Sequence, residues 1–145
     1  MLTEYGKKAY SFYQKFHQNK INRVIHVATI PVLIWTLAFA LQAIRATGAI
    51  SLGYVYLYYL MDPATLFPMS VFWGGTYFSS YVLYHNRPPW MWWYVGWLHV
   101  LAWVCQFAGH RFFEGNRPAL MESVTQAFVT APLFVYYEVN EWWYT

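Results

Sequence analysis

Charged residues are scarce in this sequence. Only 10% of its 145 residues are Asp, Glu, Lys or Arg, against roughly 25% in an ordinary soluble domain. By contrast, 59% of the residues are hydrophobic and 23% are aromatic. A chain with this composition is short of polar groups for a water-facing surface, so the composition predicts a membrane protein. The single cysteine, Cys105, excludes an intramolecular disulfide and any cysteine-rich metal site.

Two further features are missing. The net charge is +3, but the cations do not alternate with stacking aromatic residues in a polar segment, so nucleic acid is not expected as a partner. The polar stretch of residues 1–23 precedes the first apolar run, which is unlike a cleavable signal peptide. We therefore expect that run to remain in the mature protein.

Apolar runs of helical length divide the rest of the chain. Residues 3–17 carry an apolar stripe in steps of four, three and four, which predicts an amphipathic helix at the membrane interface. The stripe consists of Tyr5, Ala9, Phe12 and Phe16. Longer runs predict membrane spans, since each approaches the about 20 residues that a helix needs to cross a bilayer. The predicted spans cover residues 24–44, 66–84, 90–107 and, with more polar side chains, 119–137.

One apolar segment is too short to assign from its length. Residues 50–61 either cross the bilayer with tilt or form a re-entrant segment. The predicted fold class is all-α, a polytopic transmembrane helical bundle of four to five spans with an N-terminal amphipathic helix. We expect it to form a single membrane-embedded domain over residues 1–145.

The distribution of positive charge predicts an orientation in the membrane. If all five apolar segments cross, one side receives seven of the nine Lys and Arg residues, namely Lys7, Lys8, Lys15, Lys20, Arg23, Arg111 and Arg117. The other side receives Arg45 and Arg87. The positive-inside rule then places the N-terminus in the cytoplasm. The expected location is the inner membrane of a bacterium, or the endoplasmic reticulum of a eukaryote.

Three of the five histidines are expected at this cytoplasmic face. His17 lies in the N-terminal segment, His26 begins the first span, and His110 ends the fourth. His17 and His26 are nine residues apart, which would put them on opposite sides of one continuous helix. A bend around residues 19–22, with the span beginning near Asn22 or Arg23, is therefore required to bring the two rings together. The pattern predicts a metal site of three histidines toward the cytoplasm, although a lone interfacial histidine is often only solvated.

Gln106, His110 and Glu114 recur every four residues and should share one helical face. Glu114 can then act as a further metal ligand or as the acceptor that fixes an imidazole tautomer. Alternatively, it forms a surface ion pair of little energetic value with a nearby arginine. His99 is about 16 Å from His110 along an unbroken helix, and His85 falls in an outer loop, so neither is expected in the same site.

The stretches FYQKFHQNKINRVIHVATIP and QFAGHRFFEGNRPAL, followed by a span that ends in APLFVYYE, resemble the 2-hydroxy fatty acid dioxygenase family over nearly the whole chain. Fungal members of that family take part in converting phytosphingosine into odd-numbered fatty acids. The resemblance implies an Fe(II)-dependent, 2-oxoglutarate-independent dioxygenase that shortens a 2-hydroxy fatty acid by one carbon. The implied partners are a 2-hydroxy fatty acid, O₂ and the lipid bilayer.

By motif position, the resemblance implies His17, His26 and His110 as metal ligands. The same motifs imply catalytic roles for Asn22, Gln106 and Glu114. Neutral imidazoles suit Fe(II), and three protein ligands leave positions for the substrate and O₂. The nearby cations Lys20, Arg23 and Arg111 offer charge to the substrate carboxylate.

Other classes of function fit less of the sequence. A di-iron hydroxylase with eight histidines needs more than the five present, and there is no nucleophile-elbow pattern for a serine hydrolase. The remaining alternative is a non-catalytic membrane protein, either a bis-histidine haem carrier or a structural bundle whose polar residues bind helices together. Asn22 would then be only a helix cap.

Overall fold

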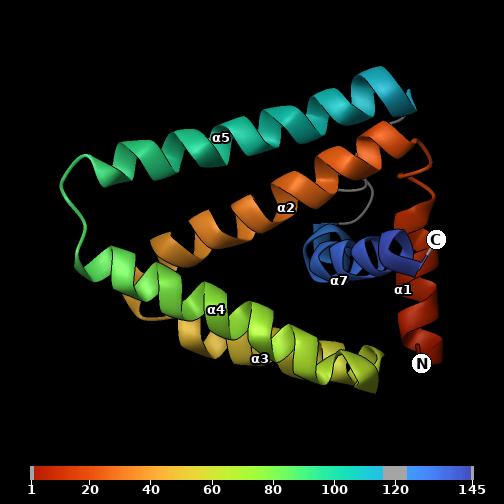
Figure 1. The fold of residues 1–145 in the computed structure, drawn as a ribbon, viewed down its shortest axis with the longest axis horizontal. Coiled ribbons are helices and arrows are strands. Elements are labelled where there is room, and N and C mark those ends of the chain that lie inside the picture. Colours follow the sequence, from red (N-terminus) through yellow and green to blue (C-terminus); the bar gives the residue numbers. More distant parts are fainter. Residues whose placement is uncertain (1, 116–123, 145) are drawn as a thin grey trace. The chain divides into compact units, whose positions relative to one another are not determined.

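The computed structural model describes residues 2–115 and 124–144, without the side chains of 125–127 and 142–144 (Figure 1). Every regular element in these ranges is helical, which confirms the predicted all-α class. The α-helices are α1 Glu4–Gln14, α2 Lys20–Leu41, α3 Thr47–Met61, α4 Leu66–His85, α5 Met91–Gly109 and α7 Val124–Tyr144. Short 3-10 helices occupy Gln42–Ile44 (η1) and Pro63–Thr65 (η2), and a π-helix, η3, occupies His110–Glu114.

The helices coincide closely with the apolar runs. The runs at 24–44, 66–84 and 90–107 correspond to α2 with η1, to α4 and to α5. The short run at 50–61 lies in α3, which has 15 residues. The first residues of the run predicted from 119 lie outside the described part of the chain, and α7 continues past that run to Tyr144.

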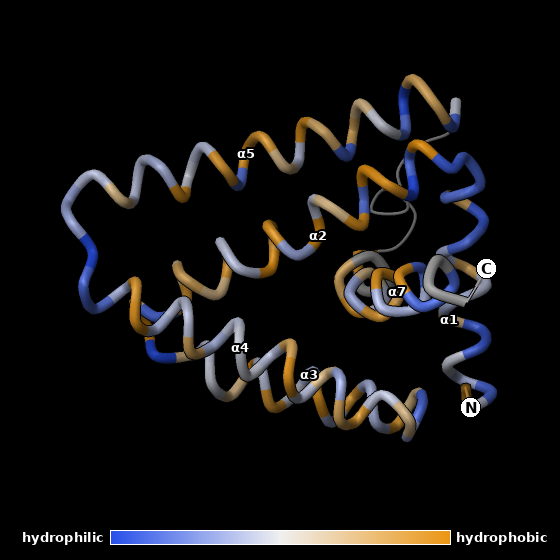
Figure 2. The backbone as a smooth tube through the Cα atoms, in the orientation of Figure 1, coloured by the Kyte–Doolittle hydropathy of each residue, from blue (hydrophilic) through white to orange (hydrophobic). Residues whose placement is uncertain are grey.

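One described helix, Lys20–Ile44, is long and apolar enough by hydropathy to cross a membrane. The four to five spans predicted from the sequence are therefore not confirmed. Figure 2 shows hydrophobic residues recurring along α2, whereas residues of intermediate hydropathy are frequent in α3, α4 and α5. The physical reason is the abundance of Tyr and Trp, whose rings are apolar but carry a polar group that lowers their hydropathy.

The chain divides into two compact units. Unit 1 comprises Met1–Gly6 and Val32–Val100, and unit 2 comprises Lys7–Pro31 and Leu101–Thr145. Helices α1, α2 and α5 therefore each contribute residues to both units. A single membrane-embedded domain stays a prediction.

In unit 1, helix α3 packs along α4 (Figure 1). Phe39, Met91 and Val95 form a buried apolar cluster in this unit. Buried polar side chains also join its segments, since Gln42 Nε2 donates to Ser80 Oγ at 3.0 Å. Such hydrogen bonds hold helices together where surrounding side chains are apolar.

The first helix begins in unit 1 and continues in unit 2, and its most deeply buried residue in unit 2, Tyr13, is not part of the predicted stripe. Tyr5 is 61% exposed, whereas Ala9 and Tyr13 are buried, with Tyr13 only 3% exposed. Phe12 and Phe16 of the expected stripe are half-buried, and contact of this stripe with a membrane interface stays a prediction. Tyr13 is buried because the ring of Phe134 in α7 packs against it with a centroid distance of 4.4 Å. This contact places the end of α1, and the residues that follow it, beside α7.

Candidate metal centre

The chain bends between α1 and α2, as the histidine spacing required. Helix α1 ends at Gln14 and α2 begins at Lys20, slightly earlier than the predicted start near Asn22 or Arg23. Asn19 caps the new helix, since its Oδ1 accepts a hydrogen bond from the Ile21 N–H at 2.8 Å. An asparagine at this position satisfies a backbone donor that the first helical turn leaves open.

The bend brings three histidines into contact within unit 2. The ring centroids of His17 and His26 are 4.4 Å apart, and His110 lies 4.8 Å from each. All three side chains are buried, and one ring nitrogen from each lies within 4.8 Å of the others. The three histidines predicted from the sequence therefore form one cluster. His17 comes from the α1–α2 bend, His26 from the second turn of α2 and His110 from the beginning of η3.

Backbone carbonyls fix the tautomers of two of these rings. His17 Nδ1 lies 2.8 Å from the Tyr13 carbonyl oxygen, and His26 Nδ1 lies 2.9 Å from the Asn22 carbonyl oxygen. A carbonyl only accepts hydrogen bonds, so each Nδ1 carries the proton and each Nε2 keeps its lone pair. Orientation of an imidazole by a carbonyl on its other nitrogen is typical of metal-binding histidines.

Two ring nitrogens of the cluster lack a hydrogen-bond partner among the described residues. His17 Nε2 and His110 Nδ1 are both buried without a hydrogen-bond partner in that part of the chain. Burial lowers the pKa of His17 to about 2, with nearby His26 contributing, and burial also lowers the pKa of His110. Buried, neutral nitrogens with unshared lone pairs suit a divalent transition metal. The donor set of this cluster therefore fits a metal ion.

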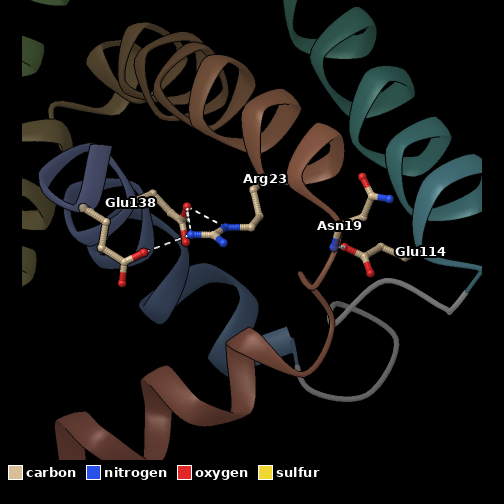
Figure 3. A network of polar contacts seen from close by, with 5 residues as sticks. Asn19, Arg23, Glu114 and Glu138 are labelled. Atoms are coloured by element: carbon tan, nitrogen blue, oxygen red, sulfur yellow. Dashed lines mark hydrogen bonds and ion pairs between the residues drawn. The ribbon is translucent and has the colours of Figure 1, made fainter. Parts of the chain in front are cut away.

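Polar residues flank the histidines on both sides. Gln106 Nε2 donates to Thr29 Oγ1 at 3.2 Å. On the other side, Glu114 Oε1 accepts hydrogen bonds from the Asn19 N–H at 2.9 Å and from Asn22 Nδ2 at 3.0 Å. Figure 3 shows the Glu114 carboxylate directed at the start of α2. The face shared by Gln106, His110 and Glu114 is thus turned toward α2.

Glu114 does not join the group of possible ligand atoms. That group comprises the three histidines when only described residues are considered. The carboxylate instead satisfies the backbone of Asn19 and the amide of Asn22, which makes it a cap for the first turn of α2.

The segment that carries His110 and Glu114 is wound as a π-helix, which the sequence pattern did not reveal. The Gly115 N–H donates to the His110 carbonyl oxygen at 3.1 Å, and Gly115 has a φ of 65°. This left-handed conformation favours glycine at the end of the helix. π-helical turns are rare and are frequently found at functional sites.

An ion pair that the sequence analysis missed joins α2 to α7. Arg23 Nε donates to Glu138 Oε2 at 2.6 Å, and Arg23 Nη2 lies 3.0 Å from Glu141 Oε2 (Figure 3). Glu138 is only 1% exposed. A buried carboxylate requires such a partner, so the Arg23 guanidinium is occupied by the glutamates of α7. The sequence analysis had instead named Arg23 as a cation that could bind the substrate carboxylate. The sequence signal for this ion pair was limited to the acidic residue, Glu138, that ends the apolar APLFVYYE motif.

Aromatic residues form one wall of the cluster. The Tyr13 ring stacks on His17 with parallel planes and a centroid distance of 4.0 Å. Phe134 of α7 packs 5.2 Å from His17 and is completely buried. The apolar wall keeps water from the histidines and preserves their neutral form.

The two remaining histidines have other contacts. His99 Nδ1 lies 2.8 Å from Thr36 Oγ1, and His85 Nδ1 lies 2.9 Å from the Tyr81 carbonyl oxygen. Neither belongs to the three-histidine cluster within the described residues, as the sequence predicted.

Comparison with known proteins identifies the family. The sequence profile of the family described as "Mpo1-like: 2-hydroxy-palmitic acid dioxygenase Mpo1-like" matches residues 3–142. The chain is also 28% identical over 130 residues to the 2-hydroxy-palmitic acid dioxygenase MPO1 of Saccharomyces cerevisiae, covering 88% of this chain and 75% of the yeast protein. No solved structure matches the chain. With a profile match over nearly its whole length, the chain belongs to the Mpo1-like family.

Proposed function

We propose that the protein is a non-haem iron dioxygenase that shortens 2-hydroxy fatty acids by one carbon. The observation that carries this proposal is the buried cluster of His17, His26 and His110, whose ring nitrogens lie within 4.8 Å of one another. Among the described residues, His17 Nε2 and His110 Nδ1 have no hydrogen-bond partner. Family membership and the name of the yeast relative support the reaction class.

The proposed ligands are the three histidines, with Fe(II) as the metal. Bound Fe(II) would supply the redox chemistry that activates O₂, and three nitrogen ligands leave coordination positions for other groups. The surrounding residues have separate tasks. The Tyr13 and Phe134 rings exclude water, and the Tyr13 and Asn22 carbonyls hold the protonated nitrogens of His17 and His26.

We assign Gln106 to a substrate oxygen, because it lies one turn from His110 on the face directed at α2. Asn22 and Glu114 act by holding the beginning of α2. Since Arg23 is occupied by Glu138 and Glu141, the exposed cations Lys20 and Arg111 remain the candidates for the substrate carboxylate.

The proposed reaction balances without a further reductant. One 2-hydroxy acid and one O₂ give the fatty acid shorter by one carbon, one CO₂ and one water. The bond between the carboxyl carbon and the hydroxyl-bearing carbon breaks, and the latter becomes the new carboxyl group. O₂ accepts all the electrons released, which agrees with an enzyme that uses no 2-oxoglutarate.

We further propose that the protein is embedded in a lipid bilayer, with the metal site toward the cytoplasm. Large apolar side chains are exposed along α4 and α5, including Phe67, Phe78, Trp93 and Trp97. Exposed apolar surface of this extent indicates an apolar environment. A bilayer would also present the acyl chain of the substrate to the enzyme.

The test combines metal analysis with oxygen uptake. Protein purified anaerobically with Fe(II) should hold one iron and consume O₂ with 2-hydroxypalmitate, releasing pentadecanoate, but not with palmitate. His17→Ala, His26→Ala and His110→Ala should each lose iron. His85→Ala should keep it, because His85 is exposed and its hydrogen bond and ring contacts in the described part of the chain lie within α4. Full iron occupancy in all three cluster variants, or a Soret band from bound haem, would overturn the proposal.

A further inference from the structure

Helix α5 lies directly against α2 at Gly109, the residue before His110 of the histidine cluster. A Cβ atom built on Gly109 would lie 2.4 Å from Asn22 Oδ1 and 3.5 Å from Asn22 Cγ. Real Cβ atoms do not approach other atoms this closely, so the packing requires a residue without a side chain. We propose that Gly109 and Asn22 are positioning residues, which set the register of α2 against α5 and so hold His26 and His110 at the spacing that a metal ion needs.

Backbone conformation does not explain the glycine. Gly109 has φ −54° and ψ −52°, which is ordinary helical geometry that any residue adopts. Glycine also weakens a helix in which it is not needed. Space is therefore the reason for glycine at this position, since the Asn22 amide lies directly against the backbone of α5.

The Asn22 side chain cannot turn away from an added methyl group without breaking other contacts. The residue is fully buried. Its Nδ2 donates to Glu114 Oε1 at 3.0 Å, and its backbone carbonyl accepts the His26 Nδ1 proton at 2.9 Å. Displacing Asn22 thus disturbs the carbonyl that orients one proposed ligand, while Gly109 is bonded directly to the other, His110.

The same helix contains a matched control. Gly96 also lies in α5, and a Cβ atom built there would meet no atom within 4 Å. Gly96→Ala therefore makes the same chemical change in the same helix without the clash. A difference between the two alanine variants reports the contact with Asn22 and not the general effect of alanine in α5.

The inference rests on the proposed metal site and is tested by metal binding, without a need for turnover. Co(II) is the probe, because it follows Fe(II) in the affinity series and its visible absorption reports ligand geometry. Gly109→Ala should weaken Co(II) binding by roughly 10-fold or more, as is typical when outer contacts of metal ligands are disturbed. The shape of the absorption bands should also change. Gly96→Ala should bind like the parent protein.

A double-mutant cycle separates a register effect from simple destabilisation. Asn22→Ala keeps the backbone carbonyl but removes the Asn22 atoms that cause the clash, which leaves only the Ile25 Cδ1 atom, 3.4 Å from the added Cβ atom, at ordinary contact distance. The proposal therefore predicts that Asn22→Ala/Gly109→Ala binds Co(II) as well as Asn22→Ala alone. If Gly109→Ala does not fold, the double variant still decides, because it should fold and bind metal. Independent, additive losses, or a Gly109→Ala variant equal to Gly96→Ala, would overturn the proposal.

Failure of this inference is distinguishable from failure of the proposed function. If the three histidine variants lose metal and Gly109→Ala does not, the metal site stands and the register proposal falls. If the histidine variants keep the metal, the site itself is wrong.

Discussion

The ring of Tyr13 lies flat on the ring of His17, with an interplanar angle of 0° and centroids 4.0 Å apart. The Tyr13 carbonyl oxygen also accepts the His17 Nδ1 proton. One residue therefore both supports the imidazole face and sets its tautomer. The stacking depends on the Tyr13 side chain, whereas the hydrogen bond depends on the Tyr13 backbone. A substitution that removes the ring therefore removes the stacking and keeps the hydrogen bond.

Tyr13→Ala should lower both stability and metal affinity, whereas Tyr13→Phe should preserve both. The alanine variant leaves a cavity beside His17, and loss of a buried aromatic ring costs about 3–5 kcal/mol. Phenylalanine keeps the stacked ring, and both variants keep the carbonyl. Denaturation midpoints and metal titrations check this. Equal metal affinity in the alanine variant would show that the stacked ring does not position His17.

Glu114→Gln should retain the metal, because the structure uses this residue to cap α2. The glutamine oxygen can still accept from the Asn19 N–H, as the carboxylate does. Glu114→Ala removes the cap and should cost about 1 kcal/mol. Iron content and unfolding free energy measure the two effects. Complete loss of iron in the glutamine variant would instead identify the carboxylate as a ligand.

Arg23→Ala should strongly destabilise the protein. It leaves the carboxylate of Glu138, which is 1% exposed, buried without its guanidinium partner, and such losses cost about 3–5 kcal/mol. Glu141→Ala is the control, because Glu141 is 53% exposed on the same arginine and surface pairs contribute about 0–1 kcal/mol. Denaturant titrations should rank the variants in that order. Equal effects would contradict the assignment of Glu138 as the important partner.

Protein stripped of metal by a chelator should lose stability as the pH falls below about 6.5. Burial lowers the pKa of His17 to about 2, so the folded chain keeps this ring neutral while the unfolded chain takes up a proton. The stability is therefore present above pH 6.5 and decreases toward acid, by at most about 1.4 kcal/mol per pH unit for each such group. In His17→Gln the slope between pH 7.5 and 5 should be smaller. An unchanged slope would show that His17 takes up its proton over the same pH range in the folded and the unfolded chain.

His99→Phe should keep the metal, since His99 contacts Thr36 and is not part of the cluster. The hydroxyl of Thr36 retains another partner, because it also donates to the Val32 carbonyl oxygen at 2.8 Å. Metal analysis of the purified variant is the measurement. Loss of metal would place His99 in the site.

The sequence predicted most helix positions because apolar runs and helix lengths are local properties. It also predicted the meeting of His17 with His26, because their spacing of nine residues required a bend to put them on one side. It could not predict that Tyr13 is buried against the protein, because that burial depends on Phe134, which is distant in the sequence. The Arg23–Glu138 pair joins residues 115 positions apart, and no local pattern encodes such a partner.

The π-helix and Gly109 were missed for a related reason. Gln106, His110 and Glu114 have the spacing of an ordinary α-helix, and that spacing alone does not show that the last interval is wound more widely. Gly109 gives no signal in a single sequence, because its importance comes from the Asn22 amide that packs against it.

The hydrogen bonds that α5 and η3 make to α2 should render the segment from Gln106 to Glu114 less tolerant of insertions and deletions than the turn that precedes α5. Gln106 and Glu114 reach α2 on either side of the histidines, and each added residue turns an α-helix by about 100°. A one-residue insertion or deletion between them would turn one partner away from α2 while leaving the other in place. The turn at 86–90, which joins α4 to α5, is not helical, so an added residue there does not rotate one part of α5 against another. Natural length variation among related chains should therefore collect there and avoid the segment from Gln106 to Glu114.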